Sequence, residues 1–374
     1  MRPTLKVALL AVLGSWVGEP PGFGGEIGMG ANLCSSSGCH GGAGEHSRQF
    51  VVWSQSDVHS RSFATLTSAR AARMAEALMI RDPASSPRCT VCHAPLAGAS
   101  PAERGAGVEP SEGVSCVSCH DMPGAWLLSH TRADWGHADR VAAGMRDLGD
   151  LYTRANACVA CHQNIEPALV AVGRHPSLIF ELDGQSKDEP KHWRERPQYA
   201  GAQAWFVGQA VAMRDTSWAL LNGGADPARS LPVMHSLAWI LGRSGLNSLG
   251  PVPDGAEASP AGLATALEKA DVLAKHAAQD WEPRYGMVVL ERLAATRDDF
   301  LEPGVAAREQ ACRAERLVIA LDRLVPSIPD PVRRQSASSS LDRLFVMAQS
   351  QEDFSPTLFA HGLVEFRDCL GTGP

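Results

Sequence analysis

Apolar residues recur with helical spacing along the second half of the chain. The stretch 199–221 carries this period and ends at an Asn-Gly-Gly sequence, which commonly terminates helices. Ser259 before Pro260 and Ser355 before Pro356 each place an N-cap ahead of a proline in the first helical position. Further helices are predicted over 232–243, 283–296, 304–325 and 331–349. Because strand signals are scarce and the connections are short, we expect a helical bundle over 197–374.

The first half has weaker periodicity and more loop-forming sequence. An N-cap at Asp57 and an apolar stripe predict a helix running to about residue 80, with His59 in its first turn. Shorter helices are predicted over 134–148 and 151–162. Residues 94–112 are rich in Ala, Gly, Pro and charge. The predicted fold class is therefore mainly α, with a region of little regular structure over 26–196 followed by the helical bundle.

The N-terminal residues predict a secretory signal. Arg2 and Lys6 form a positive n-region, and the apolar run over 7–17 is too short to span a bilayer. An Ala-x-Ala cleavage site is absent, so an uncleaved anchor is the alternative. We assign residues 1–25 to a signal peptide, and expect an exported, periplasmic protein with no stable membrane insertion after its removal.

Charge and cysteine content narrow the function. The net charge of −7 argues against a nucleic-acid partner. Ten cysteines in an exported chain would usually form disulfides, yet eight of them fall in four groups, each followed directly by a histidine. The groups are Cys34, Cys39 and His40; Cys89, Cys92 and His93; Cys116, Cys119 and His120; and Cys158, Cys161 and His162.

Cys-x-x-Cys-His is the spacing that attaches a c-type haem, because two thiols meet one haem edge while an iron ligand is held close by. The first group has four residues between its cysteines instead of two. Alone it would be weak evidence for a haem site, but beside three standard motifs it is strong evidence. Zinc ribbons pair two Cys-x-x-Cys knuckles and do not need a histidine after each. The sequence therefore predicts four haem c groups with proximal ligands at His40, His93, His120 and His162.

The opposite face of each iron requires histidine, methionine or no ligand. The histidines available outnumber what four irons need, which favours bis-histidine ligation at most sites and electron transfer over catalysis. These candidates are His46, His59, His130, His137, His175 and His192. His130 and His137 are close enough in sequence that one of them could be a second-shell group. Trp53, Trp126 and Trp135 are predicted neighbours of the macrocycles.

The remaining histidines and cysteines lie in the helical half. His235, His276 and His361 have no cysteine groups beside them, and we interpret them as structural or surface residues. Cys312 and Cys369 lie on separate predicted helices, and a disulfide between them is left open.

With these residues in view, the first half resembles the family of the tetrahaem cytochrome c that accepts electrons from hydroxylamine oxidoreductase, and more broadly bacterial multihaem cytochromes. The resemblance rests on Trp53 to His59 followed by Phe63 and Leu66, on GVSCVSCH leading to a Ser-His pair, and on the fourth motif. GRHPSLIFELD is similar to a segment of related multihaem chains, with Arg174 inserted before the histidine. The resemblance covers roughly residues 34–193 and implies a tetrahaem domain over 26–196.

The resemblance also implies crossed ligation, in which each distal histidine serves a haem attached elsewhere in the chain. On this pattern His59 serves the fourth haem, His130 the first and His175 the third. In a member of this family the second haem lacks a protein sixth ligand; here His137 or His192 could take that place.

Three functions fit the sequence. The first is a tetrahaem electron carrier with a redox protein as donor and another as acceptor. The second is a multihaem oxidoreductase acting on a small nitrogen or sulfur compound at one open haem, against which no Cys-x-x-Cys-Lys motif is present. The third is a subunit of a larger respiratory complex.

Overall fold

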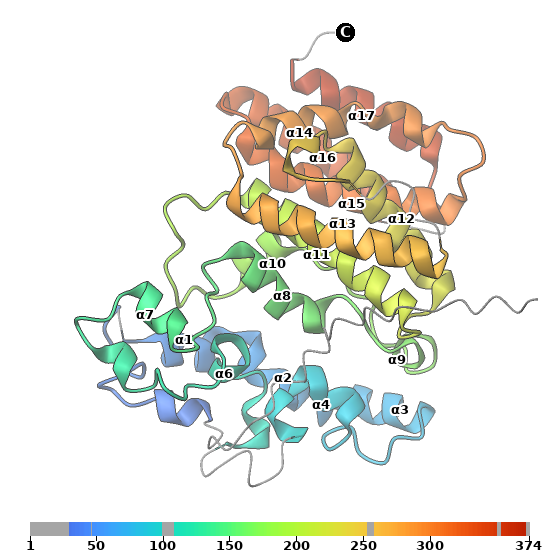
Figure 1. The fold of residues 1–374 in the computed structure, drawn as a ribbon. Coiled ribbons are helices and arrows are strands. Elements are labelled where there is room, and N and C mark those ends of the chain that lie inside the picture. The colour runs from blue at the N-terminus through green and yellow to red at the C-terminus, as the bar shows by residue number, and fades with distance from the viewer. Residues whose placement is uncertain (1–29, 46, 99–107, 253–257, 350–352, 372–374) are drawn as a thin grey trace, which may run out of the picture.

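A computed structural model describes residues 30–45, 47–98, 108–252, 258–349 and 353–371. Within these ranges every regular element is a helix, which confirms the predicted mainly α fold class (Figure 1). The predicted signal peptide and His46 lie outside the described residues. None of the described helices is both long enough and apolar enough to cross a bilayer.

The N-terminal half consists of short helices joined by loops. Its α-helices are α1 (Gln49–Ser56), α2 (Ser62–Leu66), α3 (Ala69–Ala77), α4 (Pro87–His93), α6 (Cys116–His120), α7 (His137–Ala142), α8 (Leu151–His162), α9 (Pro167–Ala171) and α10 (Leu182–Asp188). Single 3-10 turns cover Ala31–Cys34, Val58–Arg61, Pro95–Gly98, Pro110–Glu112 and Ser129–Thr131.

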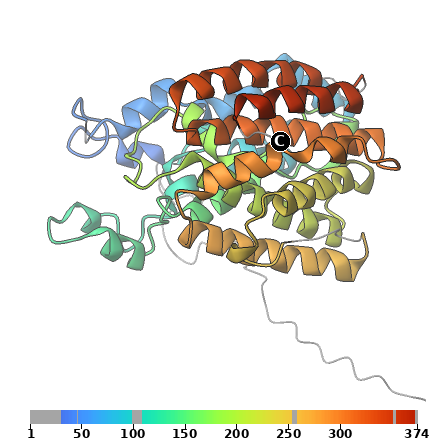
Figure 2. The same ribbon diagram turned by 90° about the horizontal axis from the view of Figure 1, so that it is seen from above.

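The C-terminal half is a bundle of long helices. These are α11 (Gly201–Leu221), α12 (Pro227–Arg243), α13 (Pro260–Gln279), α14 (Tyr285–Ala294), α15 (Ala307–Leu324), α16 (Pro331–Ala348) and α17 (Pro356–Cys369). As predicted, Ser259 and Ser355 cap α13 and α17, their side chains accepting from Gly262 and Leu358. Figure 2 shows these helices from above, with α7 projecting from the edge of the molecule as it does in Figure 1.

The prediction of one continuous helix from Asp57 to residue 80 is wrong. Asp57 does cap the turn Val58–Arg61, but the chain then forms α2 and α3 as separate helices. Ser68 has extended backbone angles and its hydroxyl accepts from the N–H of Ala71, so it starts a new helix. Serine competes for backbone hydrogen bonds in this way at helix starts. The result is that His59 lies on a short turn and not on a long helix.

Two other predicted helices have different limits. The helix predicted over 134–148 is only α7, which ends at Ala142 with Ala143 as its C-cap, because the following Gly144 has a φ of +104°. The helix predicted from Pro232 begins earlier, at Pro227, because Asp226 accepts a hydrogen bond from Ala228 and caps it. Pro232 therefore lies inside α12.

The main hydrophobic core joins the two halves of the chain. Trp205 and Phe206 of α11 are fully buried, and they share this core with α8, with Phe180 before α10 and with Leu182 at the start of α10. Burial of each such side chain stabilises the fold by about 1.5–3 kcal/mol. At Gly208 of α11, an added Cβ would lie only 2.9 Å from that of Leu182. The helical bundle is therefore the platform on which the fourth motif is mounted.

Candidate haem-binding site

The fold places three of the four Cys/His groups on helices that end at the histidine. In α4, α6 and α8 the two cysteines are three residues apart, so both thiols lie on one helix face. In the first group, the N–H of His40 donates to the carbonyl of Cys34 at 3.1 Å. This hydrogen bond draws the ends of the longer loop together, so the first group can present two thiols and an imidazole as the others do.

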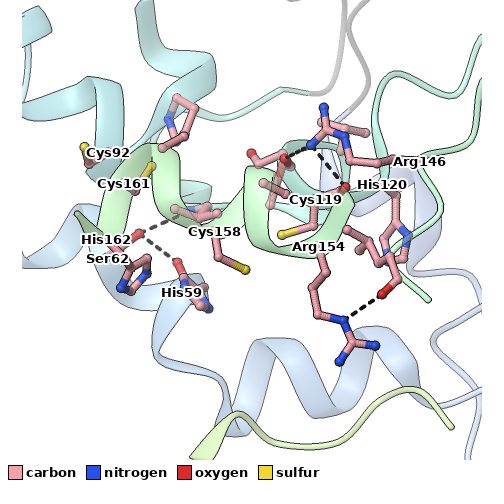
Figure 3. A pocket seen from close by; sticks show the side chains of 18 of the residues that line it. His59, Ser62, Cys92, Cys119, His120, Arg146, Arg154, Cys158, Cys161 and His162 are labelled. Carbon is pink, nitrogen blue, oxygen red and sulfur yellow. Dashed lines mark hydrogen bonds between the residues drawn. The ribbon is translucent and has the colours of Figure 1, made fainter. Parts of the chain in front are cut away.

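Three histidines of these groups each face a second imidazole from a distant part of the chain. Their ring centres are 6.0 Å apart for His40 and His130, 6.0 Å for His59 and His162, and 6.4 Å for His93 and His175. Two imidazoles bound on opposite sides of one metal ion, at about 2.0–2.1 Å per bond, have ring centres roughly 6 Å apart. The spacing in all three pairs therefore fits axial ligation of one iron. Figure 3 shows the pair of His59 and His162.

In the first pair, the Nδ1 atoms are occupied by other groups. Nδ1 of His40 lies 3.0 Å from Oε1 of Gln49, and Nδ1 of His130 is next to the carbonyls of Trp126 and Leu127. Such contacts fix a ring with Nδ1 protonated and leave Nε2 free to bind a metal.

The other two pairs are held in the same way. Nδ1 of His59 lies 3.0 Å from Asp57, whose hydrogen bond raises the pKa of His59. Nδ1 of His93 lies 3.2 Å from the carbonyl of Ser62, and that of His175 lies 2.8 Å from the carbonyl of Pro176.

Nδ1 of His162 lies 3.5 Å from the amide of Gln185 on α10. The oxygen of this amide is buried and has no hydrogen-bond partner among the described residues, so it can accept the Nδ1 proton when it is turned toward the ring.

The third group has a different environment. Burial and the neighbouring His192 and His40 lower the pKa of His120 to about 4, so its imidazole is neutral at physiological pH. Nδ1 of His192 lies 3.4 Å from the carbonyl of Pro190. Ligand atoms of His192, Asp57 and Glu189 lie within 4.8 Å of one another, and burial raises the pKa of Glu189 to about 7. His192 thus has one buried and one half-buried carboxyl group beside it.

Two of the expected distal ligands lie elsewhere than the sequence and the resemblance suggested. His175 is paired with His93 of the second group, not with His120 of the third. His137 is 63% exposed, and its Nε2 lies 3.0 Å from Asp147 and 3.3 Å from Arg196, so this nitrogen is not free. His192, which the sequence offered as an alternative for the second group, lies instead near His120 of the third.

Contacts between thiols order the four groups. Cys34 of the first group is hydrogen-bonded to Cys116 of the third, and Cys92 of the second to Cys161 of the fourth. Burial and the nearby Cys119 raise the pKa of Cys158 to about 12, so the third and fourth groups are also neighbours (Figure 3). The spatial order is first, third, fourth, second, which the order in the chain does not reveal.

A single large cavity connects all four groups. Its volume is about 3260 Å³, several times the roughly 300–1,000 Å³ of a pocket for one small ligand. All eight cysteines and their four histidines line it, together with His59, His130, His175 and His192. Trp53 and Trp126 also line the cavity as predicted, whereas Trp135 is not among the lining residues.

The cavity wall holds buried polar atoms that find no hydrogen-bond partner among the described residues. Besides the Gln185 oxygen, these are the hydroxyls of Ser115 and Ser118, Nε1 of Trp126 and Nε of Arg140. Buried polar atoms are normally paired, so such a set points to a missing polar ligand. Because most of these atoms are donors, they suit the carboxylates of haem propionates. Thiol pairs, facing imidazoles and these donors together fit haem c.

The two cysteines outside the groups are free in the structure. Cys312 is buried in α15, and Cys369 at the end of α17 is next to the carbonyl of Glu365. His235 and His276 of the helical half contact Glu309 and the carbonyl of Leu249, in agreement with a structural role.

Comparison with known proteins supports part of this description. Residues 35–121 match the family described as cytochrome c554 and c-prime, whereas no curated protein and no solved structure matches the chain. The match covers less than a quarter of the chain and includes the second and third groups and the end of the first, while the fourth group and the helical bundle lie outside it. Residues 35–121 are therefore similar to the cytochrome c554 and c-prime family, a likeness that points to a multihaem c-type cytochrome over this part of the chain.

Proposed function

We propose that this protein is a tetrahaem electron carrier of the periplasm. The eight cysteines of the four groups would attach four haems, and His40, His93, His120 and His162 would be the proximal ligands. Haem iron, when bound, supplies reversible one-electron transfer at a potential set by its ligands and surroundings.

The observation that carries this proposal is the set of three facing imidazole pairs. Each pair combines one histidine of a cysteine group with His59, His130 or His175, at ring separations of 6.0–6.4 Å. If the two imidazoles of a pair bound one haem iron, no position would be left at that iron for a small molecule. In the second group this differs from the family member that lacks a protein sixth ligand there, and it supports electron transfer over catalysis.

The spatial order of the groups supports transfer through the protein. The contacts of Cys34 with Cys116 and of Cys92 with Cys161, with Cys119 near Cys158, support an arrangement of the groups in one series with the first and second groups at its two ends. A redox protein as donor and another as acceptor can then use different ends. The helical bundle, which shares its core with α8, serves as scaffold and could mount the protein in a larger respiratory complex.

One observation favours the alternative of an oxidoreductase with an open haem. Ligand atoms of Asp57, Glu189 and His192 lie within 4.8 Å of one another, so these carboxyls would compete with the iron at His120 for the ring of His192. The third group would then have a free axial position. A small nitrogen or sulfur compound is the substrate class that we assign to this alternative.

Two measurements on the matured protein separate these functions. Pyridine haemochrome analysis should give four covalently attached haems per chain, and the reduced spectrum should not change under carbon monoxide. A count other than four would contradict the tetrahaem assignment. A carbon monoxide shift in one haem, together with turnover of hydroxylamine, nitrite or sulfite, would establish the alternative; such a shift should disappear when Asp57→Asn frees His192.

A further inference from the structure

Four exposed arginines gather beside the second group. Arg70 and Arg73 lie on α3, Arg81 follows that helix, and Arg174 follows α9. Nη2 of Arg70 lies 3.4 Å from the carbonyl of Arg174, which joins the two segments. Among the described residues, none of the four forms an ion pair, unlike nearby Arg88, which is paired with Glu166. We refer to Arg70, Arg73, Arg81 and Arg174 as the arginine patch.

Apolar side chains are exposed within this patch. Met79 is 94% exposed and Val172 is 51% exposed. The segments that carry these two side chains are in contact at Leu78 and Gly173, since a Cβ added to Gly173 would lie 2.7 Å from Cδ1 of Leu78. An apolar centre with a charged rim is the usual composition of a protein docking surface. In Figure 1, α3 and α9 lie on the same side of the molecule, opposite α7.

The patch adjoins one end of the series of cysteine groups. Arg174 directly precedes His175, whose ring faces His93 of the second group. Arg70 and Leu78 line the haem-sized cavity there. A protein bound to the arginine patch would therefore lie close to the second group.

The backbone conformation at Arg174 indicates that its charged side chain has a function. This residue has a φ of +57°, in the left-handed region that glycine adopts with least strain. Strained conformations in non-glycine residues are concentrated at functional sites. Glu76 and Asp82 add two negative charges on the same segment as Arg70, Arg73 and Arg81. The four arginines outnumber them, so the patch is positive although the whole chain has a net charge of −7.

We propose that the arginine patch docks a redox protein with an acidic surface and that electrons pass at this end of the series. The inference rests on the proposed function. Unpaired cations on an acidic protein steer an acidic partner, and steering of this kind raises association rates by about 10- to 1,000-fold at low ionic strength.

The test uses the complete haem-loaded protein and reduced flavodoxin, a small acidic electron donor, as the probe. The double variant Arg73→Glu/Arg81→Glu should lower the second-order rate of haem reduction at low salt by about tenfold or more. The difference should vanish as salt rises, because screening removes steering. The control Arg292→Glu/Arg308→Glu changes the charge equally on the exposed surface of the helical bundle, and should leave the rate near that of the wild type.

The other possible results separate a failure of the docking proposal from a failure of the proposed function. Equal rates for the double variant and the control would overturn the docking proposal, while a normal haem count and reduction by dithionite would leave the proposed function standing. Loss of haem or of reducibility in the wild type itself would contradict the proposed function instead. If the double variant loses binding to phosphatidylglycerol vesicles and keeps its rate with flavodoxin, the patch recognises an anionic membrane and the docking proposal is wrong.

Discussion

The imidazole of His130 lies 6.0 Å from that of His40, with the two ring planes only 10° apart. The segment 113–130 therefore contributes to two sites, since His120 belongs to the third group and His130 faces the first. A segment read in isolation as one haem site with its own second ligand is instead a connection between two sites.

Replacement of His130 by Ala should open one axial position at the first group. We expect carbon monoxide binding by about one haem per chain, with the iron at His40 perturbed more than the iron at His120. His137→Ala is the matched control, because Nε2 of His137 is engaged by Asp147 and Arg196. If His137→Ala produced the open site and His130→Ala did not, the assignment of these two histidines would be reversed.

Replacement of His175 by Ala should likewise open the second group and no other. Carbon monoxide should then bind one haem, and a second equivalent should bind in the double variant His130→Ala/His175→Ala, because the two sites are separate. Unchanged spectra for His175→Ala would mean that its position opposite His93 has no role in ligation.

Arg174→Gly provides a contrasting change next to His175. Glycine relieves the left-handed strain at this position, worth about 1 kcal/mol, although part of the gain is offset by the greater freedom of the unfolded chain. Thermal unfolding should therefore show equal or slightly higher stability, with an unchanged haem spectrum. A loss of more than about 1 kcal/mol would show that the arginine side chain itself stabilises this turn.

Features set by a few neighbouring residues could be predicted from the sequence, whereas contacts between distant parts of the chain could not. Ser259 and Ser355 cap their helices as predicted, because a cap depends on a few neighbouring residues. The cysteine groups could be recognised from the sequence in the same way. The pairing of His175 with His93 depends on how α9 returns to α4, and no local pattern records that path. The break at Ser68 was missed because the apolar stripe continues through it.

Asp57→Asn should raise the reduction potential of the fourth site. The carboxylate of Asp57 is 1% exposed and accepts from His59, so its negative charge increases the basicity of that imidazole. We expect a shift on the order of tens of millivolts in a redox titration followed by absorbance. Asp134→Asn, which makes the same charge change at an exposed ion pair with Arg132, should shift the potential far less.

Acid stability should depend on Glu195. Burial disfavours ionisation of this group, but hydrogen bonds from Arg154 and Trp193 outweigh it and lower the pKa of Glu195 to about 2. The stabilisation is therefore present above the unfolded pKa of about 4.3 and is lost as the pH falls toward 2. Glu195→Gln should destabilise the protein by roughly 2–3 kcal/mol at pH 7, with a smaller difference at pH 3.

Thermal unfolding at the two pH values measures this effect, with Glu291→Gln on the exposed face of α14 as control. A Glu195→Gln difference that stayed constant from pH 7 to pH 3 would show that packing, and not the charge of Glu195, stabilises the segment around His192.

The central claim is that the chain would supply both axial ligands to its haem irons, from the three facing imidazole pairs and, at the third group, from His120 and His192. Electron paramagnetic resonance of the fully oxidised protein, with spins counted against haem content, tests it most directly. The account predicts four low-spin ferric irons per chain and no high-spin signal. A high-spin signal from one iron in the wild-type protein would contradict it and identify an open site.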